Sequence, residues 1–540
     1  MGHAVQVENR CALRQHRSMN SIVGRNAILW AVATLLMLPA FTMGHIISDN
    51  SFTNVNWSEG FAQQLFSGHL EPRWLPKMSD GAGSPVFYFY GPLPFYLTAP
   101  FHLVVGPRLA VLLGMWLMLA LSGHAFQALA ADFVGATAAL IASLAYMAMP
   151  YHLLVDIWLR SDFGELGAYI FIPLCLLYVF RLMLGPVWTF ALTASLAGLL
   201  LSHLPSALLF APFLTAFCLY AATRGVFATT IARSATAAAL SLGVAAAYIV
   251  PALLLQNLIH AANWDTYLPA RNLLFSRHNL AFELFLDAIA AVALTTGAII
   301  VASAIRQNRW RSFAPWAIFS VAALFLESPV SAGVWHALPR AFDKIQFAWR
   351  VQILLDVATC MLLALAFDAN RATRAVFVRI ALFSLGALTA LFLVYANRSG
   401  RDGFLRRTAA AEEKLIAARV EPLEYLPSCR PFQSGDLSDG TSALIVQDVI
   451  AKKPPNELAV FDYPFLDVRS NGKPLPTNCD PKTGFIVVGD HRGPWEIETR
   501  SLPAERIGNL LSLSSLTIVL LGMIFSAKIR APSIEPRRSA

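Results

Sequence analysis

The chain has 540 residues, of which 56% are hydrophobic and only 14% are charged, and its mean hydropathy is +0.55. Soluble domains carry about 25% charged residues, so this composition excludes an ordinary soluble protein. The formal net charge is +8, but the basic residues gather in short loops, as is typical of membrane proteins. We therefore expect a lipid bilayer as the partner of this chain, and no nucleic acid.

Apolar runs of about 20 residues recur along the chain, and each is long enough to span a bilayer. They predict an all-α polytopic membrane protein with about twelve transmembrane helices. The first run is expected to be retained, because no small-residue cleavage site follows it. The predicted spans lie near residues 26–47, 107–128, 134–153, 166–184, 187–202, 205–222, 234–256, 283–305, 312–328, 350–368, 375–396 and 507–527.

The loops between these spans alternate in charge. Short arginine-bearing loops and both chain ends fall on one side, which the positive-inside rule makes cytoplasmic. Residues 87–105 are apolar enough to be a further span, but counting them would turn the arginine-rich loops outward. We therefore interpret 91–105 as a re-entrant or interfacial segment. The long polar loops on the outer side are 48–106, 154–165, 257–282, 329–349 and 397–506.

The region before the last span is predicted to be a small β-rich extracytoplasmic α/β domain. Residues 408–419 favour a helix, and Ser470-Asn-Gly472 is a hairpin-turn signal. Short strands are expected at 443–449, 458–463, 465–469, 485–488 and 495–499. The predicted organisation is a basic cytoplasmic tail at 1–25, a transmembrane domain at 26–396 with a long first loop at 48–106, a soluble domain at 397–506, a final span at 507–527 and a cytoplasmic tail at 528–540.

Two of the six cysteines, Cys429 and Cys479, lie in this polar region. Outside the cytoplasm a disulfide between them is permitted, and we expect that bond. Two free thiols are the alternative.

Acidic residues mark the first outer loop. Asp49 lies just past the outer end of the first span, where a carboxylate can act as a general base towards an acceptor hydroxyl. A solvated aspartate at a helix end is the simpler alternative. Glu59 is a reserve acid on residues 57–66, whose aromatic spacing suggests an amphipathic helix on the membrane surface.

A second acidic cluster enters the fourth span from the outer side. Arg160, Asp162 and Glu165 form either an internal ion-pair group or a site in which Arg160 holds a phosphate and Glu165 orients a sugar or acceptor. His203, beside a helix-breaking proline, is either structural or a proton-transfer and phosphate contact.

Two further outer loops are basic and aromatic. Arg277, His278, Lys344 and Arg350 break the positive-inside bias, so we expect them to face an anionic lipid phosphate headgroup. Interfacial anchoring by Trp and Arg is the alternative. The sequence contains neither a GxxxxGK[ST] motif nor a Cys/His cluster with zinc spacing. No metal or cofactor is indicated, although outer acids permit a divalent cation.

A set of motifs lies in order along the chain: Asp49 after the first span, Gly68-His-Leu-Glu-Pro-Arg-Trp74, 80–92, 160–165, Gln346-Phe-Ala-Trp-Arg350 and 463–473 before the final span. This pattern resembles that of bacterial multi-spanning GT-C-type glycosyltransferases. The resemblance is nearest to the YfhO-like membrane proteins and to those labelled 6-pyruvoyl-tetrahydropterin-synthase-related, a label that implies no pterin chemistry. Where several relatives have a histidine shortly after the first acid, this chain has Thr53 and Asn54.

This resemblance implies a bacterial inner-membrane enzyme with both termini in the cytoplasm and its active site on the periplasmic face. It implies transfer of a hexosyl or pentosyl group from a polyprenyl-phosphate donor to a glycan, lipid or protein acceptor by inverting displacement. Asp49 would be the base, and Arg160, Arg277, Lys344 or Arg350 would stabilise the leaving phosphate.

Two other classes of function stay open at the level of sequence. One is a transporter or flippase for lipid-linked saccharides, which would need a polar route across the whole bilayer. The other is a non-catalytic assembly protein for envelope glycans, with an inert first loop.

Overall fold

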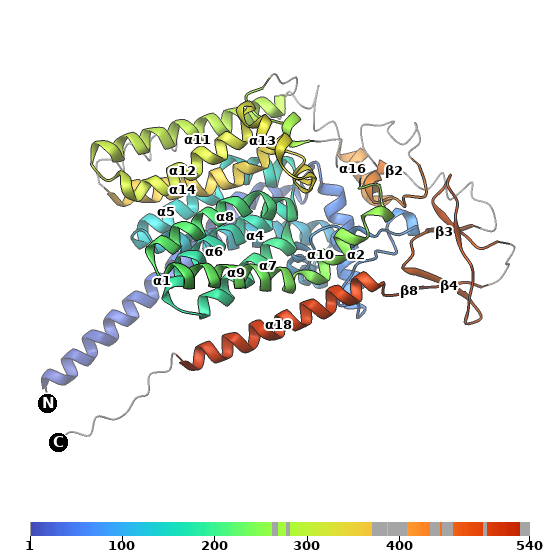
Figure 1. Ribbon diagram of the computed structural model, residues 1–540, viewed down its shortest axis with the longest axis horizontal. Coiled ribbons are helices and arrows are strands. Elements are labelled where there is room, and N and C mark those ends of the chain that lie inside the picture. Colours follow the sequence, from blue (N-terminus) through green and yellow to red (C-terminus); the bar gives the residue numbers. More distant parts are fainter. Residues whose placement is uncertain are drawn as a thin grey trace.

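The structure is a computed structural model that describes residues 2–261, 268–276, 281–369, 386, 408–431, 443–444, 457–489 and 494–529. Long helices pack side by side into a bundle (Figure 1). The C-terminal strands and helix α16 lie at one end of this bundle, whereas the start of α1 and the end of α18 lie at the other. We call the end with the strands the strand end.

The bundle is built from the following helices. In the first half of the chain they are α1 (Gly2–Met43), α4 (Pro107–Ala131), α5 (Ala136–Met147), the π-helix η4 (Tyr151–Leu159), α6 (Phe163–Arg181), α7 (Val187–Ser202) and α8 (Leu204–Arg224). In the second half they are α9 (Phe227–Val244), α10 (Ala246–Leu254), α11 (Ala281–Arg306), α12 (Trp310–Glu327), α13 (Ala332–Ala337), α14 (Gln352–Ala369) and α18 (Pro503–Ile529).

Eight helices of the described part are long and apolar enough to cross a membrane, so the chain is a multi-pass membrane protein. The predicted span at 234–256 is instead a bent helix pair, α9 with α10, at 69°. The predicted span at 312–328 is α12, which is followed at an angle of 75° by the segment Pro329–Ala337. The predicted span at 187–202 is α7, a shorter apolar helix. The predicted span at 375–396 falls outside the described residues apart from 386, so the count of twelve stays a prediction.

The bend between α9 and α10 is stabilised by hydrogen bonds with Ser512 of the last helix. The Ser512 hydroxyl of α18 donates to the carbonyl of Val244 at 2.8 Å and accepts from the amide of Ala247 at 2.7 Å. It thereby satisfies backbone groups that the break releases, which an apolar environment requires. A Cβ on Gly243 would lie 2.0 Å from Ser515, so glycine permits this close approach.

The first loop folds into short helices and has no span of its own among the described segments. These helices are α2 (Ser51–Phe66), η1 (Ser79–Gly81), η2 (Val86–Tyr88), α3 (Leu93–Thr98) and η3 (Ala99–Leu103). The expectation of a surface-lying amphipathic helix at 57–66 needs correction, because α2 starts earlier and most of its side chains are buried. Protein rather than lipid covers this helix.

The cover of α2 is residues 408–430, which we call the strap. The strap contains α16 (Ala409–Ala417), β1 (Glu421–Pro422) and η12 (Leu423–Tyr425). Ser51 of α2 donates its hydroxyl to Glu412, and Asn56 donates to the carbonyl of Leu415 at 3.4 Å. The strap therefore lies along α2 and shields it from solvent.

The remaining strands form small antiparallel sheets. Their bounds are β2 (Ala443–Leu444), β3 (Glu457–Phe461), β4 (Leu466–Ser470), β5 (Lys473–Pro474), β6 (Asn478–Cys479), β7 (Phe485–Val487) and β8 (Glu496–Thr499). Their orders are β1-β2, β3-β7-β6 and β5-β4-β8. The predicted hairpin is confirmed: Ser470 pairs with Lys473, and Asn471 and Gly472 both have positive φ, as a two-residue turn requires.

The first loop and the C-terminal region share one hydrophobic core. The Trp74 ring lies 5.7 Å from that of Tyr463 and 5.6 Å from that of Phe465. A Cβ on Gly83 would lie 2.0 Å from the Trp74 indole, so only glycine fits beneath this ring. Nearby, Arg73 forms an ion pair with Glu505 of α18 at 2.7 Å.

A disulfide joins Cys429 at the end of the strap to Cys479 in β6. The bond closes a loop with a sequence separation of 50 residues. The other cysteines with described side chains, Cys175, Cys218 and Cys360, are buried and free.

Replacing Cys479 with serine should make the strap region more sensitive to protease. On the chain-entropy model, a loop of this length contributes about 4 kcal/mol to the stability of the region that it closes. Limited proteolysis of the full chain in detergent, with and without reductant, measures the effect, and Cys218→Ala is the matched control. Equal protease resistance of Cys479→Ser and wild type would contradict this role of the bond.

Candidate functional site

Asp49 lies against the turn that precedes α6. The amide of Asp49 donates to the carbonyl of Leu159, and the amide of Asn50 donates to that of Arg160, both at 3.0 Å. The Asn54 side chain also donates to the carbonyl of Ser161, at 2.6 Å. These three hydrogen bonds hold the half-buried Asp49 beside the segment that carries the second acidic cluster.

The second acidic cluster is a buried network of ion pairs, which we call the Arg160 cluster. Arg160 contacts Asp156 at 3.1 Å, Asp162 at 2.6 Å and Glu165 at 2.8 Å. Arg350, at the start of the span that includes α14, adds contacts of 2.8 Å to Glu165 and 3.8 Å to Asp162. All five residues are buried, so each charge needs its partners to offset the cost of leaving water.

The local backbone explains why these side chains converge. The π-helix η4 ends at Leu159, and Ser161 then has a φ of 52°, which turns the chain sharply. Asp162 becomes the N-cap of α6 and accepts from the amide of Glu165 at 3.1 Å, as capping aspartates do. The turn therefore brings both carboxylates back onto Arg160.

Aromatic residues enclose the Arg160 cluster. The Trp349 ring lies 5.0 Å from the Arg160 guanidinium, a cation–π arrangement, and the Tyr151 hydroxyl donates to Glu165 at 2.8 Å. The predicted segment 346–350 thus contributes both Trp349 and Arg350 to this cluster. Trp349 and Tyr151 therefore both pack against the ion pairs of the Arg160 cluster.

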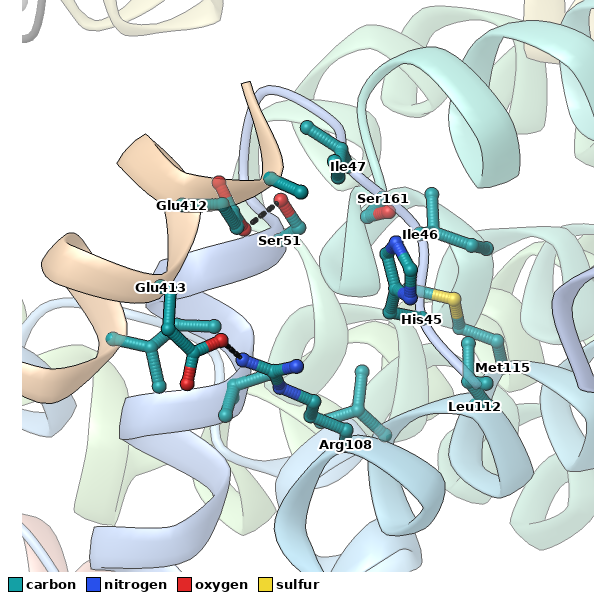
Figure 2. Close-up of a pocket in the computed structure, with 14 residues that line it drawn as sticks. His45, Ile46, Ile47, Ser51, Arg108, Leu112, Met115, Ser161, Glu412 and Glu413 are labelled. Carbon is teal, nitrogen blue, oxygen red and sulfur yellow. Dashed lines mark hydrogen bonds and ion pairs between the residues drawn. The ribbon is translucent and has the colours of Figure 1, made fainter. Parts of the chain in front are cut away.

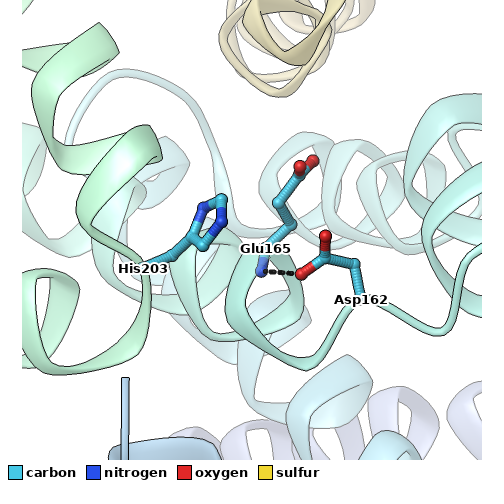
Figure 3. A group of neighbouring side chains, drawn as sticks. All are labelled: Asp162, Glu165 and His203. Carbon is cyan, nitrogen blue, oxygen red and sulfur yellow. Dashed lines mark hydrogen bonds between the residues drawn. The ribbon is translucent and has the colours of Figure 1, made fainter. Parts of the chain in front are cut away.

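His203 lies close to Asp162 and Glu165 (Figure 3). Its Nδ1 caps α8 by accepting from the Ser206 amide at 3.3 Å, and it also lies 2.8 Å from the Ser206 hydroxyl. A Cβ on Gly164 would lie 2.6 Å from the ring. Ligand atoms of the three side chains lie within 4.8 Å of one another, which is within the reach of a divalent cation. Arg160 and Arg350 already pair with both carboxylates, so the residues fit an ion-pair cluster better than a metal site.

The strap adds an acid that sequence reasoning missed. Glu424 lies half-buried on η12, and burial raises the pKa of its carboxyl to about 7, with the negative charge of Asp49 acting in the same direction. The two carboxyls are therefore electrostatic neighbours although they are far apart in sequence. No local motif around Glu424 could have indicated this neighbour.

An aromatic group lies next to these acids. The Trp57 ring lies 5.2 Å from that of Tyr90 and 5.7 Å from that of Tyr425. The Tyr90 hydroxyl is also within electrostatic range of Asp162. These rings therefore connect the neighbourhood of Glu424 with the Arg160 cluster.

The other predicted site residues lie elsewhere or are already engaged. Glu59 pairs with Arg419 of the strap at 2.9 Å, which favours a structural role. The Lys344 ammonium lies 3.4 Å from the carbonyl oxygen of Ala261. Arg277 and His278 fall outside the described residues.

A further polar group lies deeper in the bundle. The Tyr169 hydroxyl donates to Asp356 at 2.7 Å, and the His152 ring stacks on Tyr169 at 3.6 Å. Within the described spans, the Asp and Glu residues lie in the half next to the strand end, apart from Asp368 at the far end of α14. The acidic groups are thus concentrated at one end of the bundle.

The fold and site together define a multi-pass helical membrane protein with a small β region and a buried ionic cluster at one end. No protein-family model matches the chain, and a comparison with curated proteins also gives no match. Among solved structures, the chain is similar to the crystal structure of ArnT from Cupriavidus metallidurans bound to undecaprenyl phosphate. The two share 15% identity, with a TM-score of 0.42, over 73% of this chain and 75% of that one.

Replacing Arg160 with methionine should destabilise the fold strongly, because three buried carboxyl groups would lose their main partner. Breaking a buried ion pair in this way costs about 3–5 kcal/mol. Arg181→Met is the matched control, because the Arg181–Asp132 pair is partly exposed and such a pair contributes about 0–1 kcal/mol. Thermal unfolding of the purified chain in detergent compares the two variants. An equally small change in unfolding temperature for both would show that the Arg160 cluster contributes little to stability.

Proposed function

We propose that this chain is a membrane glycosyltransferase of the GT-C type that uses a polyprenyl-phosphate sugar as donor. The observation that carries the proposal is the placement of the half-buried Asp49, which is held by backbone hydrogen bonds beside the Arg160 cluster. A general base needs solvent access and a fixed position; Asp49 is half-buried, and its backbone amide is held by the carbonyl of Leu159.

The proposed reaction is a single inverting displacement at the anomeric carbon of the donor sugar. Asp49 takes the proton of an acceptor hydroxyl, whose oxygen bonds to that carbon while the bond to the phosphate oxygen breaks. The polyprenyl phosphate leaves with the bonding electrons. The rings of Trp57, Tyr90 and Tyr425 pack together next to this site.

In this proposal the Arg160 cluster does not serve mainly to bind the phosphate of the donor. Arg160 and Arg350 are already paired with acids, so their charge is largely balanced before a donor arrives. We assign Glu165 and Asp162 to the positioning of these guanidinium groups, and His203 to the wall next to them. Lys344, with Arg277 and His278, remains a candidate contact for the lipid phosphate.

The distribution of charged groups favours this enzyme over the transporter alternative. A transporter needs polar groups along the whole path across the bilayer. In the described spans the acids are concentrated at the strand end, apart from Asp368. By the positive-inside rule that end faces the periplasm of a bacterial inner membrane, so the acceptor would be a periplasmic glycan, lipid or protein.

Asp49→Asn should reduce sugar transfer by about 100-fold or more, the typical contribution of general acid–base catalysis, while donor binding persists. The assay uses the purified full chain with a panel of undecaprenyl-phosphate sugars and follows release of undecaprenyl phosphate. Glu413→Gln, at an exposed acid of α16, is the control and should stay near wild type. Donor binding without turnover in wild type, or equal turnover in Asp49→Asn, would overturn the proposal.

A further inference from the structure

The strap is attached to the helices beneath it at its start. Glu412 accepts a hydrogen bond from the Ser51 hydroxyl of α2, and Glu413 pairs with Arg108 of α4 (Figure 2). The ion pair is partly exposed, and exposed pairs of this kind contribute little stability. The rest of the strap must therefore be held mainly by its buried contacts.

Two of these contacts lie just before and just after Glu421. The Arg419 carbonyl accepts from the amide of Ser79 at 2.8 Å. The Tyr425 ring lies 5.7 Å from the Trp57 ring, edge to face. Glu421 therefore belongs to a stretch of the strap that is fixed on the first loop at both ends.

Glu421 is buried in this interface. Only 1% of the residue is exposed, and in the described part of the chain neither of its carboxyl oxygens has a hydrogen-bond partner. Two polar groups close to it, the Ser84 hydroxyl and the Trp57 indole, are uncharged. Burying an ionised carboxylate without partners costs far more than burying a neutral carboxyl. The closed strap therefore requires a protonated Glu421.

We propose that the strap is a pH-sensitive cover, which lies on the first loop while Glu421 is protonated and lifts away when Glu421 ionises. On lifting, the Glu421 carboxyl passes its proton to water, and α2 is uncovered. The disulfide from Cys429 to Cys479 keeps the end of the strap attached to β6 in the open state. This inference does not depend on the transferase function, because the position of the strap is measured without turnover.

The acids of the strap set the direction of the pH dependence. Burial raises the pKa of the Glu421 carboxyl well above its ordinary value, and burial with the charge of Asp49 raises the pKa of the Glu424 carboxyl to about 7. A carboxyl whose pKa is raised in the closed state favours closure at low pH, and this contribution is lost as the pH rises towards the raised pKa. Above about pH 7 Glu424 is already ionised in the closed protein, so Glu421 is the strap acid that still opposes opening.

The other titratable and charged groups near this part of the strap come from several elements. Burial raises the pKa of the Tyr425 and Tyr463 phenols, so both stay neutral near pH 7. The backbone amide of His260 donates to the Glu424 carbonyl at 3.0 Å. The cations of the strap itself are Lys414, Arg419, which pairs with Glu59, and Arg430.

Limited proteolysis of the full chain in detergent tests the proposal, because cleavage follows the population of the open form when closure is fast. Cleavage within residues 408–430 is followed between about pH 7 and 9 and divided by that of an unstructured substrate at the same pH. Wild type should be cleaved up to about tenfold faster per pH unit, since Glu421 releases one proton on opening. Glu421→Gln should be cleaved slowly at every pH. Glu413→Gln, at an exposed acid of the same strap, should keep the pH dependence of wild type.

Infrared spectra give a second measurement, which does not depend on cleavage. Near pH 7 the full chain in detergent should show absorption from protonated carboxyl groups. This absorption should be weaker in Glu421→Gln, because one neutral carboxyl is lost, and unchanged in Glu413→Gln.

The outcomes decide the proposal whether or not the chain transfers sugar. Slow, pH-independent cleavage of Glu421→Gln together with a weaker carboxyl absorption supports it. A wild-type cleavage rate that does not change with pH, or the same pH dependence in Glu421→Gln as in wild type, overturns it. Rapid cleavage of Glu421→Gln at every pH would show that Glu421 only packs the interface. A carboxyl absorption that Glu421→Gln leaves unchanged would show that Glu421 is ionised under the closed strap, which also overturns the proposal.

Discussion

The Arg160 cluster is the constraint on which the strand end of the bundle depends. Each of its ions loses several kcal/mol of hydration on burial, so the cluster is stable only when all partners are in place. Those partners come from η4, α6 and the start of the span that contains α14. Correct packing of three spans is therefore coupled to the pairing of a few charges, and Asp49 is attached to the same turn.

The parts of the fold that local sequence determines were predictable. Apolar runs indicated the spans, and Asn471 and Gly472 indicated a hairpin. The bend between α9 and α10 was not predictable, because Ser512, which satisfies its backbone, lies in the last helix. Glu424 was missed for the same reason: the contacts that place the strap on the first loop are long-range, and no periodicity or spacing encodes them.

The motifs that suggested the family divide into two structural roles. Asp49, Arg160 and Arg350 belong to the candidate site. Arg73 pairs with Glu505 of α18, and Trp74 packs on Tyr463 and Phe465 over Gly83. This second set docks the C-terminal region on the first loop. Some of these motif residues therefore belong to the candidate site, and others hold the C-terminal region on the first loop.

The strap also has a consequence for biosynthesis. Chains emerge from the ribosome N-terminus first, so α2 enters its compartment long before residues 408–430 exist. Until then the face of α2 that carries Asn56 and Trp57 lacks the partners that cover it in the folded protein. The site around Asp49 is thus completed only when almost the whole polypeptide has been translated, and a chain that ends prematurely cannot assemble it.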